Sequence, residues 1–368
     1  MNILIFVIIL LVLVLSHEFG HFIVAKLNKI RVDEFSFGFP PKIFGKKIGE
    51  TTYNFNALPF GGYVKIFGEN PDEESTNGLD KKRSFFHKPW YIKASVLFAG
   101  VAMNFIVAWL LLSIGFMSGL PTSTSMAPEG TTIKDQALTI VSVVSNSPAE
   151  TAGLKVGDKI SHLESYNNKK EVSDSTLILS SIFTAETVQS FVKRHSDEEI
   201  TFSIIRAKEK IEISLTPEDK IVGISMDTIG KLSLPVHKAV WEGLKLSSDL
   251  TVRIAVGFYT LIKDGLTGQG DLSAVTGPIG IIGIVGDAAE FGFIYLLSFT
   301  AFISINLVII NLLPFPALDG GRLLFLLIEK IKGSSIKPQI GNLINFLGFG
   351  ILMLFMALIT YHDIIKLF

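Results

Sequence analysis

The sequence predicts a multi-pass α-helical membrane protein with four transmembrane helices, a membrane-associated β-hairpin and an α+β domain inserted outside the membrane. Composition gives the first indication, since hydrophobic residues make up 48% of the 368 residues, charged residues only 18%, and the mean hydropathy is +0.47. Soluble domains carry about 25% charged residues. The second indication is that the apolar residues gather in four runs of about the length that a bilayer core requires, roughly 20 residues.

The four predicted spans cover residues 3–26, 94–118, 291–313 and 343–362. The first run could instead be the apolar region of a signal peptide. However, only Met1 and Asn2 precede it, without a basic residue, and no small-x-small cleavage site follows it. We therefore expect a retained helix, so that residues 1–118 form an N-terminal membrane part and residues 291–368 a C-terminal one.

The orientation follows from the positive charges. Lysine and arginine are concentrated in the segment between the first two spans and in the segment between the last two. The positive-inside rule places such segments in the cytoplasm. Both ends of the chain and residues 119–290 are then expected outside the cytoplasm.

Charge and cysteine content exclude several classes of function. The formal net charge is −1, so no basic surface is expected for nucleic acid. The sequence has no cysteine, which excludes disulfides and thiol catalysis. Any metal site must therefore use histidine, aspartate or glutamate.

The inserted α+β domain is predicted at residues 125–232. Residues 138–145 are rich in β-branched side chains, which favours a strand. Residues 147–158 (SPAETAGLKVGD) indicate a short helix that ends at a glycine and is followed by a turn. Thr184 is placed to cap a second helix.

Two further strands complete this domain, at residues 200–206 and 210–215, where apolar and polar residues alternate. The order of elements resembles a PDZ domain. Such domains bind extended peptide ends by adding a strand to a sheet edge, so the resemblance implies a peptide C-terminus as a partner. Residues 233–290 then hold an amphipathic helix, expected at the membrane surface or against the PDZ domain, and a linker.

The residues that carry chemistry begin inside the first span, in the sequence His-Glu-Phe-Gly-His. Positions i and i+4 of a helix share one face, so the imidazoles of His17 and His21 can reach one ion. A bound Zn²⁺ would lower the pKa of its water towards 7, and Glu18 could accept the proton. A charged group in the middle of a span is unfavourable by about 2.5–3.5 kcal/mol, and polar residues placed there indicate function.

A third metal ligand must come from elsewhere, and Asp319 is the candidate. It lies in residues 311–322 (NLLPFPALDGGR), at the end of the third span. The prolines break the helix and the two glycines allow close backbone approach. The alternative interpretation is a simple turn with a helix-capping aspartate.

These two motifs together resemble the site-2 protease family, in the bacterial branch typified by the regulator of sigma-E protease. The resemblance extends over essentially the whole chain. It includes residues 36–40 (SFGFP), which resemble a glycine-containing loop after the first span, residues 56–65 (NALPFGGYVK) and residues 277–280 (GPIG). That branch carries two tandem PDZ domains, whereas this chain has room for one.

The resemblance implies roles for individual residues. His17, His21 and Asp319 would bind one Zn²⁺, and Glu18 would be the catalytic base. Asn311 would hold the substrate backbone, although a structural amide between helices is an equal alternative. In the second span, we expect Asn104 to hydrogen-bond across helices rather than to contact substrate.

The membrane-associated hairpin is predicted at residues 50–68, with residues 52–56 pairing with residues 63–67. Open strand edges are excluded from lipid but tolerated at a cavity or a partner. An available edge could replace the backbone hydrogen bonds that a helical substrate loses when it unwinds. Asn56, Gly61 and Gly62 are therefore candidate substrate-binding residues. A cytoplasmic surface hairpin is the alternative.

The expected function is that of a zinc-dependent intramembrane endopeptidase in the bacterial inner membrane. Its substrates would be single-span membrane proteins, such as an anti-sigma factor or remnant signal peptides, cut within the lipid bilayer. One rival hypothesis is a PDZ-bearing membrane scaffold with a structural metal site, which leaves Glu18 without a role. Another is a metal transporter, which requires further ligands along a path through the membrane.

Overall fold

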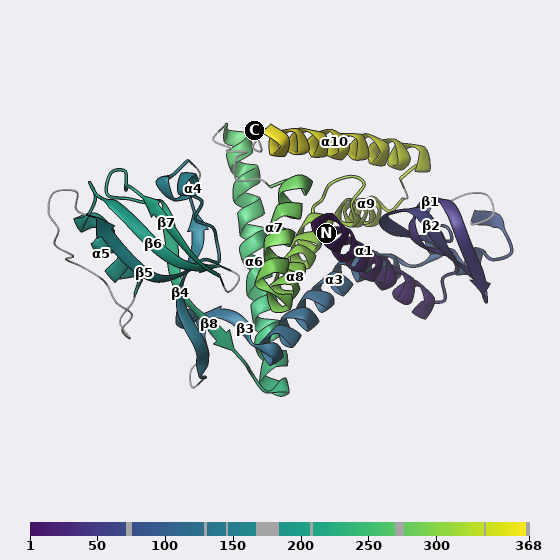
Figure 1. The fold of residues 1–368 in the computed structure, drawn as a ribbon. Coiled ribbons are helices and arrows are strands. Elements are labelled where there is room, and N and C mark those ends of the chain that lie inside the picture. Colours follow the sequence, from purple (N-terminus) through teal and green to yellow (C-terminus); the bar gives the residue numbers. More distant parts are fainter. Residues whose placement is uncertain are drawn as a thin grey trace. The chain divides into compact units, whose positions relative to one another are not determined.

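The computed structural model describes residues 1–70, 76–128, 131–144, 146–166, 184–206, 209–268, 276–334 and 336–365. The chain divides into two compact units. The helical unit comprises Met1–Ile114, Val240–Ala289 and Leu296–Phe368, and the sheet unit comprises Gly115–Ala239 and Glu290–Tyr295. Figure 1 shows both, coloured along the chain.

Among the described residues, four helices are long and apolar enough to cross a membrane. They are α1 (Asn2–Leu27), α3 (Trp90–Ser118), α8 (Phe293–Leu312) and α10 (Pro338–Ile365). They coincide closely with the four predicted spans. The predicted amphipathic helix is also present, as α6 (Val236–Thr267). Two helices were not predicted, α7 (Pro278–Phe291) and α9 (Asp319–Lys332).

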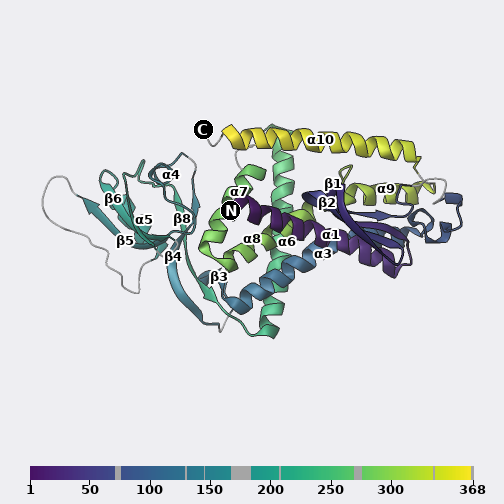
Figure 2. The ribbon, with the colours of Figure 1, turned by 45° about the vertical axis from the view of Figure 1, so that its right-hand side comes forward.

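The helical unit is held together by apolar side chains from several helices. Ile9 and Leu13 of α1 pack with Val285 of α7. Close backbone approach brings α1 against α3, since a Cβ on Gly20 would lie 2.3 Å from the carbonyl oxygen of Ala99. In contrast, α10 buries little of its apolar surface. Figure 2 shows α10 running along the outside of this unit.

A two-stranded antiparallel sheet, β1 (Val32–Ile48) with β2 (Thr51–Ile66), follows α1. Its register corrects the predicted hairpin, because residues 52–56 and 63–67 do not pair with each other. Phe35 pairs with Tyr53 on one side and with Val64 on the other, so the first half of β1 lies between two segments of β2. The Gly-containing stretch at residues 36–40 is therefore strand rather than loop.

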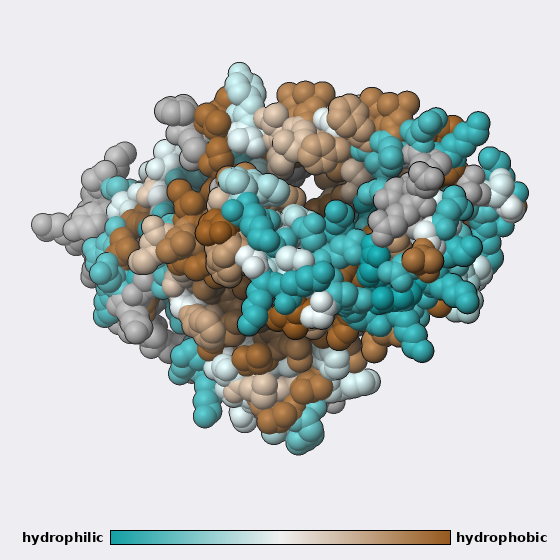
Figure 3. Space-filling model, turned by 90° about the vertical axis from the view of Figure 1, so that its right-hand side faces the viewer, coloured by the Kyte–Doolittle hydropathy of each residue, from teal (hydrophilic) through white to brown (hydrophobic). Residues whose placement is uncertain are grey.

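The β1–β2 sheet leads into two short helical turns and then α3. These turns are η1 (Lys81–Arg83) and η2 (Phe85–His87). The amide of Phe85 donates to the carbonyl of Phe67 at 2.8 Å, which ties η2 to the end of β2. The face of the molecule that carries β1 and β2 shows a broad hydrophilic area with hydrophobic residues at its margin (Figure 3).

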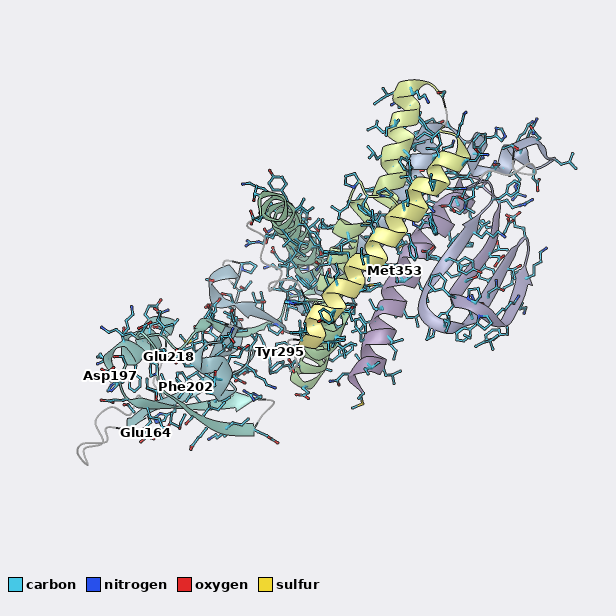
Figure 4. All side chains as sticks on the ribbon, turned by 90° about the horizontal axis from the view of Figure 1, so that it is seen from above. Glu164, Asp197, Phe202, Glu218, Tyr295 and Met353 are labelled. Carbon is cyan, nitrogen blue, oxygen red and sulfur yellow. The ribbon has the colours of Figure 1, made fainter. Side chains whose placement is uncertain are left out.

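The sheet unit is built on a six-stranded sheet in the order β3-β8-β4-β5-β6-β7. Its elements are β3 (Leu120–Ser123), η3 (Thr124–Met126), β4 (Ile133–Val143), α4 (Pro148–Ala152), β5 (Lys159–Tyr166), α5 (Ala185–Arg194), β6 (Glu199–Arg206), β7 (Glu209–Leu215) and β8 (Ile224–Leu232). Phe191 of α5 and Phe202 of β6 are fully buried in its core. Figure 4 labels Phe202 in this unit and Met353 on α10 of the helical unit. Met353 is 46% exposed, whereas Phe202 is fully buried.

The local predictions for this unit are confirmed. Ser147 caps α4, and Gly153 ends it in the left-handed conformation, with φ of 88°. Thr184 caps α5 through a reciprocal capping box. The antiparallel pairing of β6 with β7 matches the predicted strand pair.

Candidate metal centre

The structure brings His17, His21 and Asp319 together. The two histidines lie one turn apart on α1, and Asp319 lies in the first turn of α9. Asp319 Oδ2 is 3.0 Å from His17 Nε2 and 3.2 Å from His21 Nε2. The three ligand atoms all lie within 4.8 Å of one another.

Hydrogen bonds on the far sides of the imidazole rings set their orientation. His21 Nδ1 lies 2.8 Å from the carbonyl oxygen of Val96, to which it donates. Such a bond leaves the lone pair of Nε2 free for a metal. His17 Nδ1 lies 3.4 Å from the side-chain amide of Asn104. The amide nitrogen faces the ring, and the amide oxygen is buried without a hydrogen-bond partner within the described residues. Rotation of the amide by 180° would let this oxygen accept from the N–H of His17 Nδ1 and leave Nε2 free for a metal.

The donor set fits zinc. With both Nδ1 atoms protonated, two imidazole lone pairs and a carboxylate oxygen point at one another. Asp319 Oδ2 is buried and has no hydrogen-bond donor besides the imidazoles within the described residues. Converging lone pairs repel unless a cation lies between them. Two imidazoles and one carboxylate form a common ligand set of catalytic zinc sites.

Glu18 lies beside these ligands in the same cavity. The cavity has a volume of about 420 Å³, and its lining includes His17, Glu18, His21, Asn311 and Asp319. The backbone of β2 passes nearby, since a Cβ on Gly62 would lie 3.9 Å from Glu18 Cγ. A group able to move a proton is thus held next to a possible metal position, in a space large enough for several residues of a peptide.

Of the other predicted site residues, some line the cavity and others serve the β1–β2 sheet. Asn311 lines the cavity, as does Tyr63 of β2, which was not predicted. Asn56 differs from the prediction, because its side chain is buried and donates to the carbonyl oxygen of Gly38 at 2.9 Å. It therefore stabilises the β1–β2 sheet. Gly61 faces Phe39, which lies 3.0 Å from where its Cβ would be, and its φ of 126° favours glycine.

Asn104 has the predicted role of a bridging residue. It is fully buried in α3, contacts His17 of α1, and its backbone carbonyl accepts from the hydroxyl of Ser304 of α8 at 2.8 Å. Gly100 of α3 also contacts the site and was not predicted from the sequence. A Cβ there would lie 2.4 Å from His21 Nε2, so the imidazoles pack directly on the backbone of α3.

Arg322 also lines the cavity, one turn after Asp319. It forms an ion pair with Glu69, which follows β2. The carboxylate of Glu69 raises the pKa of the Arg322 guanidinium above its usual value, so this residue stays charged. The pair connects the start of α9 to the end of the β1–β2 sheet.

The fold and the site together define a metal-dependent hydrolase whose two histidines and glutamate lie on an apolar helix. The sequence profile of Peptidase family M50 matches residues 5–355. This is nearly the whole chain, so the protein belongs to that family, the site-2 proteases.

Individual relatives agree with this assignment. A protein of Clostridium acetobutylicum that carries the provisional description of a zinc metalloprotease is 34% identical over 370 residues, covering 99% of this chain and 97% of the relative. The regulator of sigma-W protease RasP of Bacillus subtilis is 30% identical over 441 residues, covering 99% of this chain and 98% of the relative. The zinc metalloprotease RasP of Bacillus licheniformis is 28% identical, with the same coverage. The protein is therefore a zinc metalloprotease of a membrane-embedded family.

Proposed function

We propose that this protein is an intramembrane endopeptidase that hydrolyses peptide bonds within or near the transmembrane segments of single-span membrane proteins. In this proposal His17, His21 and Asp319 bind one Zn²⁺, and Glu18 is the catalytic base. The observation that carries the proposal is the convergence of three ligand atoms within 4.8 Å, two of them on a helix apolar enough to cross a membrane.

Glu18 has two tasks in this mechanism. Zinc, when bound, supplies Lewis acidity that polarises a carbonyl and acidifies water. Glu18 accepts a proton from water as the water oxygen attacks the carbonyl carbon of the scissile bond. It then delivers that proton to the amide nitrogen, so that the carbon–nitrogen bond breaks and a neutral amine leaves.

The β1–β2 sheet can present the substrate backbone in extended form. A helical segment hides its amides in hydrogen bonds from i to i−4, so it must unwind before hydrolysis. In the described register, residues 62–66 pair with β1 on one side only, and Gly62 lies beside Glu18. Strand addition at this edge would replace the lost hydrogen bonds. We assign Asn311, which lines the same cavity, to the substrate backbone.

The proposed topology follows the positive charges. The four apolar helices span the bacterial inner membrane, with both ends and the sheet unit outside the cytoplasm and the metal site near the cytoplasmic side. The name of the Bacillus subtilis relative, regulator of sigma-W protease, favours an anti-sigma factor as one substrate class. Remnant signal peptides are a second class with the same single-span form.

Residues 125–232 are proposed to form a single PDZ domain. Its support is the order of elements, with the capped helix α4 after β4 and the amphipathic α5 between β5 and β6. A peptide C-terminus bound there would select substrates before they reach the zinc site.

The test is cleavage of a tagged single-span substrate in reconstituted vesicles, by the wild type and by Glu18→Gln, with zinc counted in both proteins. We expect the wild type to cleave and Glu18→Gln to retain one zinc ion but to be slower by about 10²–10⁴-fold, the usual contribution of a general base. Equal cleavage rates would remove Glu18 from the mechanism. Cleavage that persists after chelation of zinc would contradict the proposed reaction as a whole.

A further inference from the structure

The turn that precedes Asp319 has an unusual backbone. Ala317 has a φ of 74°, in the left-handed region that residues with a Cβ adopt rarely. Backbone of this kind persists only where its surroundings fix it, and it gathers at functional sites. Neighbouring groups must therefore hold Ala317 in place.

The first of these groups lies on α10. The side-chain oxygen of Asn345 accepts a hydrogen bond from the backbone amide of Ala317 at 3.2 Å. Gly348 lies three residues further, on the same face of α10. A Cβ on Gly348 would lie 2.4 Å from Cβ of Pro316, so α10 contacts the turn at two adjacent points.

The opposite side of the turn is closed by its own chain. A Cβ on Gly320 would lie 2.3 Å from the carbonyl oxygen of Leu312, at the end of α8. A Cβ on Gly321 would lie 2.1 Å from the carbonyl oxygen of Phe315. The turn is thus confined between the end of α8 and α10, and little else of α10 is buried.

We propose that Asn345 is a positioning residue for the metal site. It holds Ala317 in the left-handed conformation, which directs the carboxylate of Asp319 at His17 and His21. The inference rests on the proposed role of Asp319 as a metal ligand. Zinc–oxygen bonds are about 2.0–2.2 Å long, so a shift of 1 Å in the turn would take this oxygen out of coordination.

The test measures zinc affinity of the full-length protein in detergent, by competition with a chelator. We expect Asn345→Ala to bind zinc about tenfold more weakly, as for other residues that orient a ligand. Asn345→Asp keeps an acceptor oxygen and should retain the wild-type affinity. The matched control is Asn342→Ala on the preceding turn of α10, an exposed residue whose side chain has no hydrogen bond within the described residues.

A double variant separates positioning from simple docking of α10. Glycine adopts the left-handed region without strain, so Ala317→Gly should restore most of the zinc affinity that Asn345→Ala loses. If Asn345 only stabilised α10, this restoration would not occur. Gly348→Ala gives an independent check, because its new methyl group would displace Pro316 and weaken zinc binding even if Asn345→Ala fails to fold.

The outcomes are distinguishable from failure of the proposed function. If Asp319→Ala leaves zinc affinity unchanged, the proposed ligand set is wrong. If Asp319→Ala abolishes binding while Asn345→Ala and Gly348→Ala both equal the Asn342→Ala control, the positioning role is wrong and the ligand set stands. Zinc loss in Asn345→Ala without rescue by Ala317→Gly would also overturn the positioning role.

Discussion

Asp158 in the sheet unit and Asp319 in the helical unit are both buried carboxylates, but their surroundings differ in kind. Asp158 receives two hydrogen bonds of 2.7 Å from the guanidinium of Arg206 and one of 2.9 Å from the amide of Lys155. Its charge is fully compensated by the protein. Asp319 faces two imidazoles, and its Oδ2 has no hydrogen-bond donor besides them within the described residues.

The difference shows how a structural carboxylate can be told from a candidate metal ligand. A buried anion is stable only when it is paired and hydrogen-bonded. Where the protein supplies a bidentate arginine, the pair serves the fold. Where its neighbours are imidazoles, which can bind a metal, a bound cation would supply the compensating charge. The predictions below test this contrast.

The largest effect is expected for removal of each carboxylate. Asp319→Ala should weaken zinc binding by more than about 100-fold, beyond the range of outer-shell changes, with the sheet unit unaffected. Asp158→Ala should leave zinc affinity unchanged but lower the free energy of unfolding of the sheet unit by about 3 kcal/mol, because Arg206 loses its partner. Chelator competition and hydrogen exchange of β4–β6 measure the two effects. The contrast fails if both variants lose zinc equally.

A smaller effect is expected for a substitution that displaces the imidazole rings but leaves all three ligand residues in the sequence. Gly100→Ala would place a methyl group 2.4 Å from His21 Nε2, and the backbone of helix α3 cannot move away to make room for it. We expect zinc affinity to fall by nearly 100-fold, the upper end for substitutions of residues that orient a metal ligand. Gly257→Ala on α6 is the control, since no atom lies within 4 Å of its added Cβ, and it should bind zinc normally. Equal affinities would show that the rings adjust.

A still smaller effect is expected for Asn104→Ala. His17 then loses the partner that orients its ring, and zinc affinity should fall about tenfold. Asn306→Ala on α8 is the matched control, because the Asn306 side chain is partly exposed and, within the described residues, bonds only to the carbonyl of Phe302 in its own helix. An Asn104→Ala protein with wild-type zinc affinity would reduce Asn104 to a packing residue.

The smallest effect concerns a partly exposed carboxylate, Glu50. The side chains of Lys26 and Arg83 lower the pKa of Glu50 below its usual value of 4.5. A lowered pKa gives stability that is present above about pH 4.5 and lost as pH falls through the lowered value. Because the side chain is 33% exposed and solvent screens the pairs, the effect should be at most about 1 kcal/mol. In Glu50→Gln, the melting temperature should depend less on pH between pH 5 and 3 in low salt. A pH dependence equal to that of the wild type would contradict this prediction.

Much of the fold followed from local patterns. The four long helices follow from apolar runs, and α4 and α5 from their capping residues, since these signals lie within a few neighbouring residues. The strand pairing of the β1–β2 sheet was mispredicted, because β1 pairs with two segments of β2 at once. Gly38 and Pro40 suggested a loop there, and only tertiary contacts make it a strand.

The candidate site was predictable in its ligands but not in their supports. His17, Glu18 and His21 share one helical motif, and Asp319 follows from its resemblance to a known motif. Val96 supports His21 through its backbone carbonyl, and Asn345 supports Ala317 through its side-chain amide. Both lie far along the chain from the residues they support. Their residue types carry no signal of this role. Asn56 has a plausible type and place, but its amide is used within the sheet.

The most direct test of the central claim is X-ray absorption spectroscopy of the zinc-loaded protein, compared between the wild type and His21→Ala. The sequence has no cysteine, so only nitrogen and oxygen ligands are expected. We predict about two imidazole nitrogens at roughly 2.0–2.1 Å together with oxygen, and loss of one imidazole, or of the zinc itself, in the variant. A spectrum that stays the same in His21→Ala would place the zinc elsewhere and contradict the assignment of the site.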